Sequence, residues 1–203
     1  IFQIYLLAMF LWSVSAFMTL SGLEDILRWF RVMTLAPIIM TIAIYYFVQT
    51  LFGFRRKWAP LVFAYGLLLI PLSLFTPFLI KEAAFEAGNL HYQFGPLLFV
   101  VAIPGYGLNI FNLAELAKGY SQSSDINQRN RFRYLILALS ITILATLINF
   151  TEWGKYPIDI AANTLSAMLI AYAILRHKLL DIQIVVRLGL LYSITTTILG
   201  LIY

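Results

Sequence analysis

RYLILALSITILATLINFT, residues 133–151, decides the fold of this chain. After Arg133 the stretch carries no charged residue. A hydrocarbon core about 30 Å thick takes about 20 apolar residues of helix. Because lipid offers the backbone no hydrogen-bonding partner, a continuous apolar run of this length must be a helix that satisfies its own N–H and C=O groups. The stretch therefore predicts a transmembrane helix.

The rest of the chain has the same character. Of its 203 residues, 62% are hydrophobic and 11% are charged, whereas a soluble domain has roughly 45–50% apolar and about 25% charged residues. Polar breaks separate seven apolar segments: residues 1–20, 23–54, 60–80, 96–118, 133–151, 158–175 and 186–203. None alternates with a period of two, which disfavours a transmembrane β-barrel. The sequence predicts an all-α, polytopic transmembrane helical bundle with seven helices in this chain.

Prolines occur at the starts and inside two of these segments. Pro60 and Pro96 stand at first-turn positions, where a missing N–H costs nothing. The prolines inside the segments predict kinks or a local break: Pro71, Pro77 and Pro104. Pro104 stands in the stretch Pro104-Gly105-Tyr106-Gly107, where the helix is expected to kink or to break.

Small residues recur at four-residue spacing in the sixth segment. The pairs are Ala162 with Ser166 and Ala167 with Ala171. In lipid, small side chains let two helix backbones approach closely. We therefore expect this segment to pack tightly against a neighbouring helix.

Lysine and arginine are divided unequally between alternate loops. The loops after the second, fourth and sixth segments carry ten of them, and the other loops carry four. By the positive-inside rule, the first set lies in the cytoplasm. The net charge of +5 is then +7 on the cytoplasmic side and −2 outside, which argues against nucleic acid as a partner. We expect a multi-pass protein of the cell inner (plasma) membrane, with the lipid bilayer as its partner.

The chain has no cysteine and only two histidines, His91 and His177, far apart in the sequence. Disulfides and thiolate ligands are therefore excluded, and a zinc or haem site is disfavoured. Paired carboxylates or histidine clusters that would support catalysis are also missing. We expect no metal, no cofactor and no enzyme activity in this chain.

The densest polar and aromatic group near the predicted outer face surrounds the loop before the sixth segment. The candidate ligand-binding residues are Glu152, Trp153, Tyr156, Asp159 and Asn163. Ligand pockets combine apolar walls with a few convergent polar groups, so these side chains could bind a small molecule or a peptide. The alternative is anchoring, because Trp and Tyr collect at membrane interfaces and an Asp favours a helix N-terminus.

Three polar side chains lie at three-residue spacing on the fourth segment: Asn109, Asn112 and Glu115. This spacing places them on one helix face. Polar groups inside a membrane usually face the bundle and are candidates for function. The alternative is structural, with both asparagines bonding across helices and Glu115 lying at the interface.

Four stretches carry a resemblance to a known family. They are Ile1-Phe2 with Leu11-Trp12, Arg129-x-Arg131-x-Arg133-Tyr134, Tyr156-Pro157-Ile158-Asp159 followed by Asn163, and IAYAILRHKLLDI at residues 170–182, continuing to Val186-Arg187 and Leu191-Tyr192. Together they resemble the N-terminal seven-transmembrane region of bacterial and archaeal sensor histidine kinases. The resemblance covers most of the chain and is most specific in its last third.

The resemblance implies that one more helix precedes the chain. Residues 1–177 would then be the seven-transmembrane sensor region without its first helix, and residues 178–203 a cytoplasmic linker and the start of an additional transmembrane helix. Cytoplasmic domains would come after Tyr203, so we expect the chain to be a fragment. The family also implies a homodimer.

The link after the sixth segment is the candidate for signal transmission. Its residues are Arg176, His177, Asp181 and Arg187. Any displacement of the sixth helix has to pass through this link to reach the cytoplasmic domains. The alternative is anchoring, because basic residues at a helix end bind anionic lipid.

The expected function is that of a signal-input module of a two-component histidine kinase, which passes an extracellular or intramembrane signal to cytoplasmic domains. The alternative is a small transporter or permease subunit. The expected break at Pro104 supports this alternative, because discontinuous helices line transport sites. Against it, the chain offers no second broken segment in an equivalent position.

Overall fold

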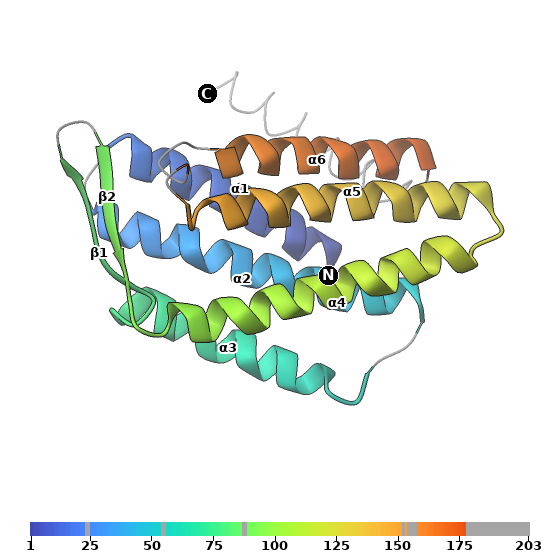
Figure 1. Cartoon of the computed structure of the whole chain (residues 1–203), viewed down its shortest axis with the longest axis horizontal. Coiled ribbons are helices and arrows are strands. Elements are labelled where there is room, and N and C mark those ends of the chain that lie inside the picture. The colour runs from blue at the N-terminus through green and yellow to red at the C-terminus, as the bar shows by residue number, and fades with distance from the viewer. Residues whose placement is uncertain (23–24, 54–55, 87–88, 152, 154–157, 178–203) are drawn as a thin grey trace, which may run out of the picture.

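The computed structural model describes residues 1–22, 25–53, 56–86, 89–151, 153 and 158–177. Within these residues it contains six helices and one β-hairpin (Figure 1). The elements are α1 (Phe2–Leu20), α2 (Ile26–Leu51), α3 (Ala59–Phe75), β1 (Ile80–Glu86), β2 (Asn89–Phe94), α4 (Leu98–Gln122), α5 (Ile126–Ile148) and α6 (Ile158–His177). The predicted helical bundle is confirmed for these six segments. The seventh predicted segment, residues 186–203, lies outside the described residues.

Four of the described helices are long and apolar enough to cross a membrane: α1, α2, α4 and α5. The apolar stretches of the other two, Ala59–Phe75 and Ile158–Ile174, are shorter. Large apolar side chains are exposed on the outside of α1, α3, α4, α5 and α6, including Phe10 on α1, Phe63 on α3 and Ile103 on α4. Water would not tolerate so much exposed apolar surface, and lipid does. These exposed faces are therefore the surface that meets the bilayer.

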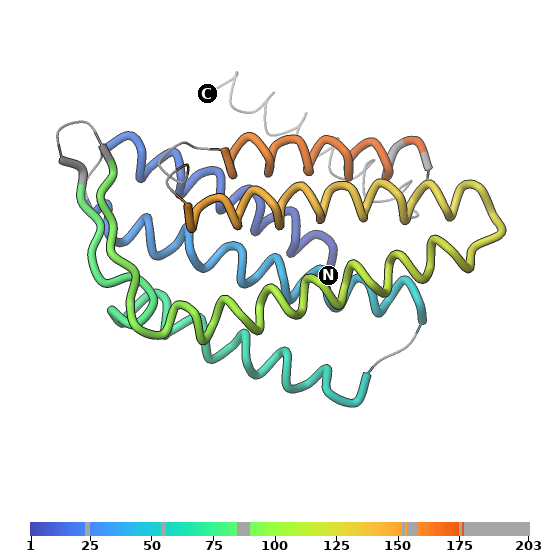
Figure 2. Tube along the Cα trace, in the orientation of Figure 1, coloured from blue at the N-terminus to red at the C-terminus, as the bar shows by residue number. Residues whose placement is uncertain are grey.

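The helices run up and down between two ends of the bundle (Figures 1 and 2). One end, which we call the hairpin end, holds the β-hairpin and the starts of α2, α4 and α6. The opposite end holds the starts of α3 and α5. α1 packs along α2 and α5 packs along α6, and the main core lies between these pairs. α3 lies at the outside, against α2.

The helix limits differ from the sequence predictions in two places. α4 continues from Leu98 to Gln122 with Pro104 inside it, so the expected break in residues 104–107 does not occur. α5 begins at Ile126 and not at residue 133, because Asp125 caps its first turn. The side chain of Asp125 accepts a hydrogen bond from the Asn127 N–H at 3.0 Å, which satisfies one free donor of the helix start. The loop between α4 and α5 is therefore short.

The β-hairpin was not predicted from the sequence. β1 and β2 pair antiparallel, with Ala83 opposite Tyr92. At its base, the Gly95 N–H donates to the Leu79 carbonyl at 2.8 Å. A Cβ at Gly95 would overlap the backbone of Pro77 and Phe78, so only glycine allows this close approach.

Arg31 of α2 fastens the hairpin to the bundle. Its guanidinium donates to the carbonyls of Leu74, at the end of α3, and Ile80, at the start of β1, each at 3.4 Å. The Ser73 hydroxyl donates to the Arg31 carbonyl at 3.2 Å. A cation near the C-terminus of α3 is also favoured by the helix dipole. The hairpin is thereby held over the ends of the helices.

The close packing expected for the sixth segment is found at Ser166. Its side chain is fully buried, and its hydroxyl donates to the Ala138 carbonyl of α5 at 2.9 Å. It also accepts a hydrogen bond from the Thr142 hydroxyl at 2.8 Å. A small side chain at this position lets α5 and α6 approach and bond directly.

Candidate ligand cavity

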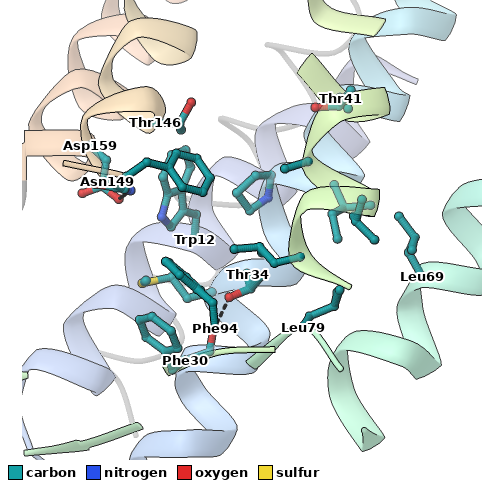
Figure 3. Close-up of a pocket in the computed structure, with 18 of the residues that line it drawn as sticks. Trp12, Phe30, Thr34, Thr41, Leu69, Leu79, Phe94, Thr146, Asn149 and Asp159 are labelled. Atoms are coloured by element: carbon teal, nitrogen blue, oxygen red, sulfur yellow. Dashed lines mark hydrogen bonds between the residues drawn. The ribbon is translucent and has the colours of Figure 1, made fainter. Parts of the chain in front are cut away.

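A cavity of about 280 Å³ lies inside the bundle, towards the hairpin end. All six described helices and the strand β2 contribute to its lining. Most of its walls are apolar, and they include seven aromatic residues: Trp12, Phe30, Tyr65, Tyr92, Phe94, Tyr106 and Phe150. Figure 3 shows Asp159 and Asn149 together at one side of the cavity and Leu69 and Leu79 at the other. An apolar space with a few polar groups is the usual form of a small-molecule site.

Asp159 is the acidic group of the cavity. It stands in the first turn of α6 and only 7% of its surface is exposed. One carboxylate oxygen accepts a hydrogen bond from the Asn149 side-chain amide at 3.0 Å. The other accepts from the Ile160 N–H at 2.9 Å. Because a helix N-terminus favours negative charge, α6 supports a carboxylate at this place.

Tyr92 brings a phenol from the hairpin into the cavity wall. Burial raises the pKa of the Tyr92 hydroxyl, and the negative charge of Asp159 raises it further. The neutral phenol is therefore favoured over the phenolate. Tyr92 keeps its proton near neutral pH and can donate a hydrogen bond inside the cavity.

The predicted ligand-binding residues are only partly brought together. Asp159 lines the cavity, but Trp153 is 66% exposed and does not. Asn163 is buried elsewhere, with its side-chain amide donating to the Met9 carbonyl and the Ser13 hydroxyl at 3.3 Å each. It therefore ties α6 to α1. Glu152 and Tyr156 lie outside the described residues.

Asn109 bonds to α2 and Glu115 to Arg56, which follows the end of α2. We call this group of polar residues the polar seam, formed by Thr41, Gln49, Arg56, Asn109, Asn112 and Glu115. The Asn109 amide donates to the Thr41 hydroxyl at 3.0 Å, and both residues line the cavity. Glu115 forms an ion pair with Arg56 at 3.0 Å towards the opposite end. The polar seam thus runs from the cavity towards the far end of the bundle.

Asn112 stands in the middle of the polar seam. It is fully buried, and neither polar atom of its side chain has a hydrogen-bonding partner among the described residues. Most buried amides are paired, and an unpaired one raises the free energy of the folded state. Asn112 is therefore expected to lower the stability of the packing around the middle of α4.

Of the residues predicted to transmit a signal, the structure describes Arg176 and His177, at the opposite end. Arg176 is exposed near the end of α6, and His177 is the last residue of that helix. Asp181 and Arg187 lie outside the described residues. Among the residues that the structure describes, no cluster of three His, Asp or Glu side chains could hold a metal ion.

Sequence reasoning missed the contribution of the hairpin to the cavity. Leu90, Tyr92 and Phe94 line the cavity, and His91 and Gln93, between them, do not. Leu90 and Tyr92 are half-buried, whereas His91, Gln93 and the outer part of Phe94 are exposed. This alternation has the period of two that marks a strand with one buried face. The signal is present in the sequence, but it covers too few residues to stand out between long apolar helices.

Comparison with known proteins identifies the family of this chain. Residues 1–183 match the family model described as the N-terminal 7TM region of histidine kinase. Neither a curated protein nor a solved structure gives a significant match. The match spans most of the chain, as the resemblance in its motifs implies. The chain belongs to the family formed by the N-terminal seven-transmembrane regions of histidine kinases.

Proposed function

We propose that this membrane region receives a signal in its cavity and passes it to kinase domains on the cytoplasmic side. The observation that carries the proposal is the cavity itself, which is lined by all six described helices and by the hairpin. An occupant would touch every helix at once. It could therefore favour one arrangement of the bundle over another, provided that it binds the two arrangements with different affinity.

The polar seam supports a path for the signal. Asn109 and Thr41 contact both the cavity and each other. Towards the other end, Gln49 of α2 accepts a hydrogen bond from the backbone N–H of Arg56, which follows α2, at 3.0 Å. The Arg56 guanidinium forms the ion pair with Glu115 of α4. A shift of α4 against α2 at the cavity would change the distance between Arg56 and Glu115. The coupling needs a two-state contact, and the unpaired Asn112 makes this contact easy to rearrange.

A substitution that fills the cavity should imitate an occupant. Gly105 lines the cavity, and a Cβ added there meets nothing within 4 Å. With the chain joined to a histidine kinase core in nanodiscs, Gly105→Leu is expected to change the autophosphorylation rate by about fivefold or more, a typical coupling between sites.

Gly107→Leu is the matched control for this experiment. Gly107 lies on the same helix, is exposed, and also has open space around an added Cβ, but it does not line the cavity. The Gly107 variant should phosphorylate at the wild-type rate. Equal rates for Gly105→Leu, Gly107→Leu and wild type would contradict a sensory cavity.

The transporter alternative loses its main support, because α4 is continuous through Pro104. Discontinuous helices were the feature that favoured it. Solute flux into proteoliposomes that contain the chain would restore it. The family match favours the sensor.

The basic residues support an orientation for the sensor. Those of the opposite end, among the described residues, are Arg56, Lys57, Lys118, Arg129, Arg131, Arg133 and Arg176. The described basic residues of the hairpin end are Arg28, Arg31 and Lys81. By the positive-inside rule, this excess favours the cytoplasm for the opposite end and the outside for the hairpin.

Cysteine labelling tests this orientation directly, because the chain has no cysteine of its own. Glu82→Cys places a thiol on the exposed hairpin, and Ser121→Cys places one at the exposed end of α4. A maleimide that cannot cross membranes should label the first variant in intact cells and the second only after permeabilisation. The reverse pattern would show that the hairpin is cytoplasmic.

A further inference from the structure

We propose that the cavity takes a small, largely apolar molecule that carries a protonated amine, with Asp159 as its counter-ion. The inference rests on the proposed function and names the chemical class of its signal. Three observations carry it: the charge of the lining, the aromatic walls and the size of the space.

The charge of the lining is the first observation. Asp159 is the only charged side chain among the described residues that line the cavity. It accepts hydrogen bonds from two neutral donors, the Asn149 amide and the Ile160 N–H. A carboxylate has about four acceptor positions, so it can accept a further donor. A buried charge without an opposite charge is costly, and a cationic ligand would supply that charge.

The aromatic walls are the second observation. The cavity that Asp159 lines also has aromatic walls, formed by Tyr92, Tyr106 and Phe150 among others. The charge of the Asp159 carboxylate acts on the Tyr92 hydroxyl and raises its pKa. Aromatic faces attract cations and give an apolar stem a large surface to contact. An anionic ligand would lack the attraction between its head group and the aromatic faces, and the carboxylate would repel it.

The size of the space is the third observation. A cavity of about 280 Å³ lies near the lower limit of known ligand pockets, which run from about 300 to 1,000 Å³. This volume suits a single small molecule with one ring or a short chain. It is too small for a peptide of several residues, which was the other class of ligand expected from the sequence.

Three probes that share one ring test the proposal: 2-phenylethylamine, 2-phenylethanol and phenylacetate. Each is titrated by calorimetry into the full chain in nanodiscs, with empty nanodiscs subtracted. We expect the amine to bind at least about tenfold more tightly than the alcohol, as a charge-assisted hydrogen bond would give. The carboxylate should show no binding. An amine that binds no better than the alcohol would overturn the proposal.

The variants assign the effect to Asp159. Asp159→Asn keeps the shape of the side chain and removes its charge, so it should weaken amine binding at least about tenfold. Its affinity for 2-phenylethanol should not change, and this shows that the cavity is still folded. Glu82→Gln is the control, since it removes an exposed carboxylate of the hairpin outside the cavity. Loss of amine binding in this control would also refute the assignment.

A Lys155→Met variant tests for a counter-ion of Asp159 within the chain, since Lys155 lies outside the described residues. Amine binding that occurs only in a Lys155→Met variant would show such an internal pair and overturn the proposal. The amine could also come from a lipid headgroup. Weaker binding of 2-phenylethylamine in nanodiscs rich in phosphatidylethanolamine than in phosphatidylglycerol would assign a lipid source, and equal binding a soluble one.

The outcome separates this inference from the proposed function. If 2-phenylethylamine does not bind while Gly105→Leu still changes the autophosphorylation rate, the proposed ligand class is wrong and the proposed sensor function is retained. If the amine binds while Gly105→Leu has no effect, the cavity is a binding site without a role in signalling.

Discussion

Ser166→Leu is expected to destabilise the bundle by at least about 1–3 kcal/mol, the usual cost of forcing a larger side chain into a packed interior. Ser166 is fully buried between α6 and α5, and its hydroxyl bonds Thr142 and the Ala138 carbonyl. Leucine has no room there, and it leaves the Thr142 hydroxyl without its partner on α6. The measurement is the free energy of unfolding in mixed micelles.

Ala171→Leu is the control for this prediction. Ala171 is on the same helix and belongs to the same pattern of small residues, but its side chain is exposed. Leucine there should leave the free energy of unfolding unchanged within about 0.5 kcal/mol, as for most surface substitutions. If both variants lost the same stability, the α5–α6 contact would not be centred on Ser166.

The positions of the described helices could be predicted from the sequence because long apolar runs in lipid have one stable backbone structure. The ends of the helices could not. α5 begins at Ile126 because Asp125 caps it and residues 126–133 form polar turns beyond the apolar run. Hydropathy detects the part of a helix that lies in lipid. It does not detect the turns that continue past it.

The cavity could be predicted only in part. Asp159 was a candidate from its place among aromatic residues, and it does line the cavity. Its neighbours there include Trp12 and Tyr92, which are far from it in the chain and come close only when the helices pack. Trp153 is next to this group in sequence and yet exposed. Sequence proximity indicates the right end of the bundle, and packing decides which side chains point inward.

Asn112→Leu is expected to leave the bundle as stable as wild type or to stabilise it, whereas Asn109→Leu is expected to destabilise it. The substitution is the same and both residues lie on α4, but their surroundings differ. Asn109 loses a hydrogen bond to Thr41, worth about 0.6 kcal/mol on average between membrane helices. Asn112 loses only unpaired polar atoms, and removing a buried unpaired group relieves about 1–3 kcal/mol. Unfolding of the two variants in micelles measures both effects.

This difference bears on the signal, because an unpaired amide that costs stability in one arrangement can find a partner in another. If the polar seam switches between two such arrangements, leucine at position 112 removes the polar side chain whose pairing would stabilise the second arrangement. Asn112→Leu should then suppress most of the change in autophosphorylation that Gly105→Leu produces, although the protein is no less stable. A double variant that still responds fully would mean that the signal reaches the opposite end without the polar seam. A destabilised Asn112→Leu would show that this side chain is already paired in the folded protein, and that the polar seam is a fixed contact and no switch.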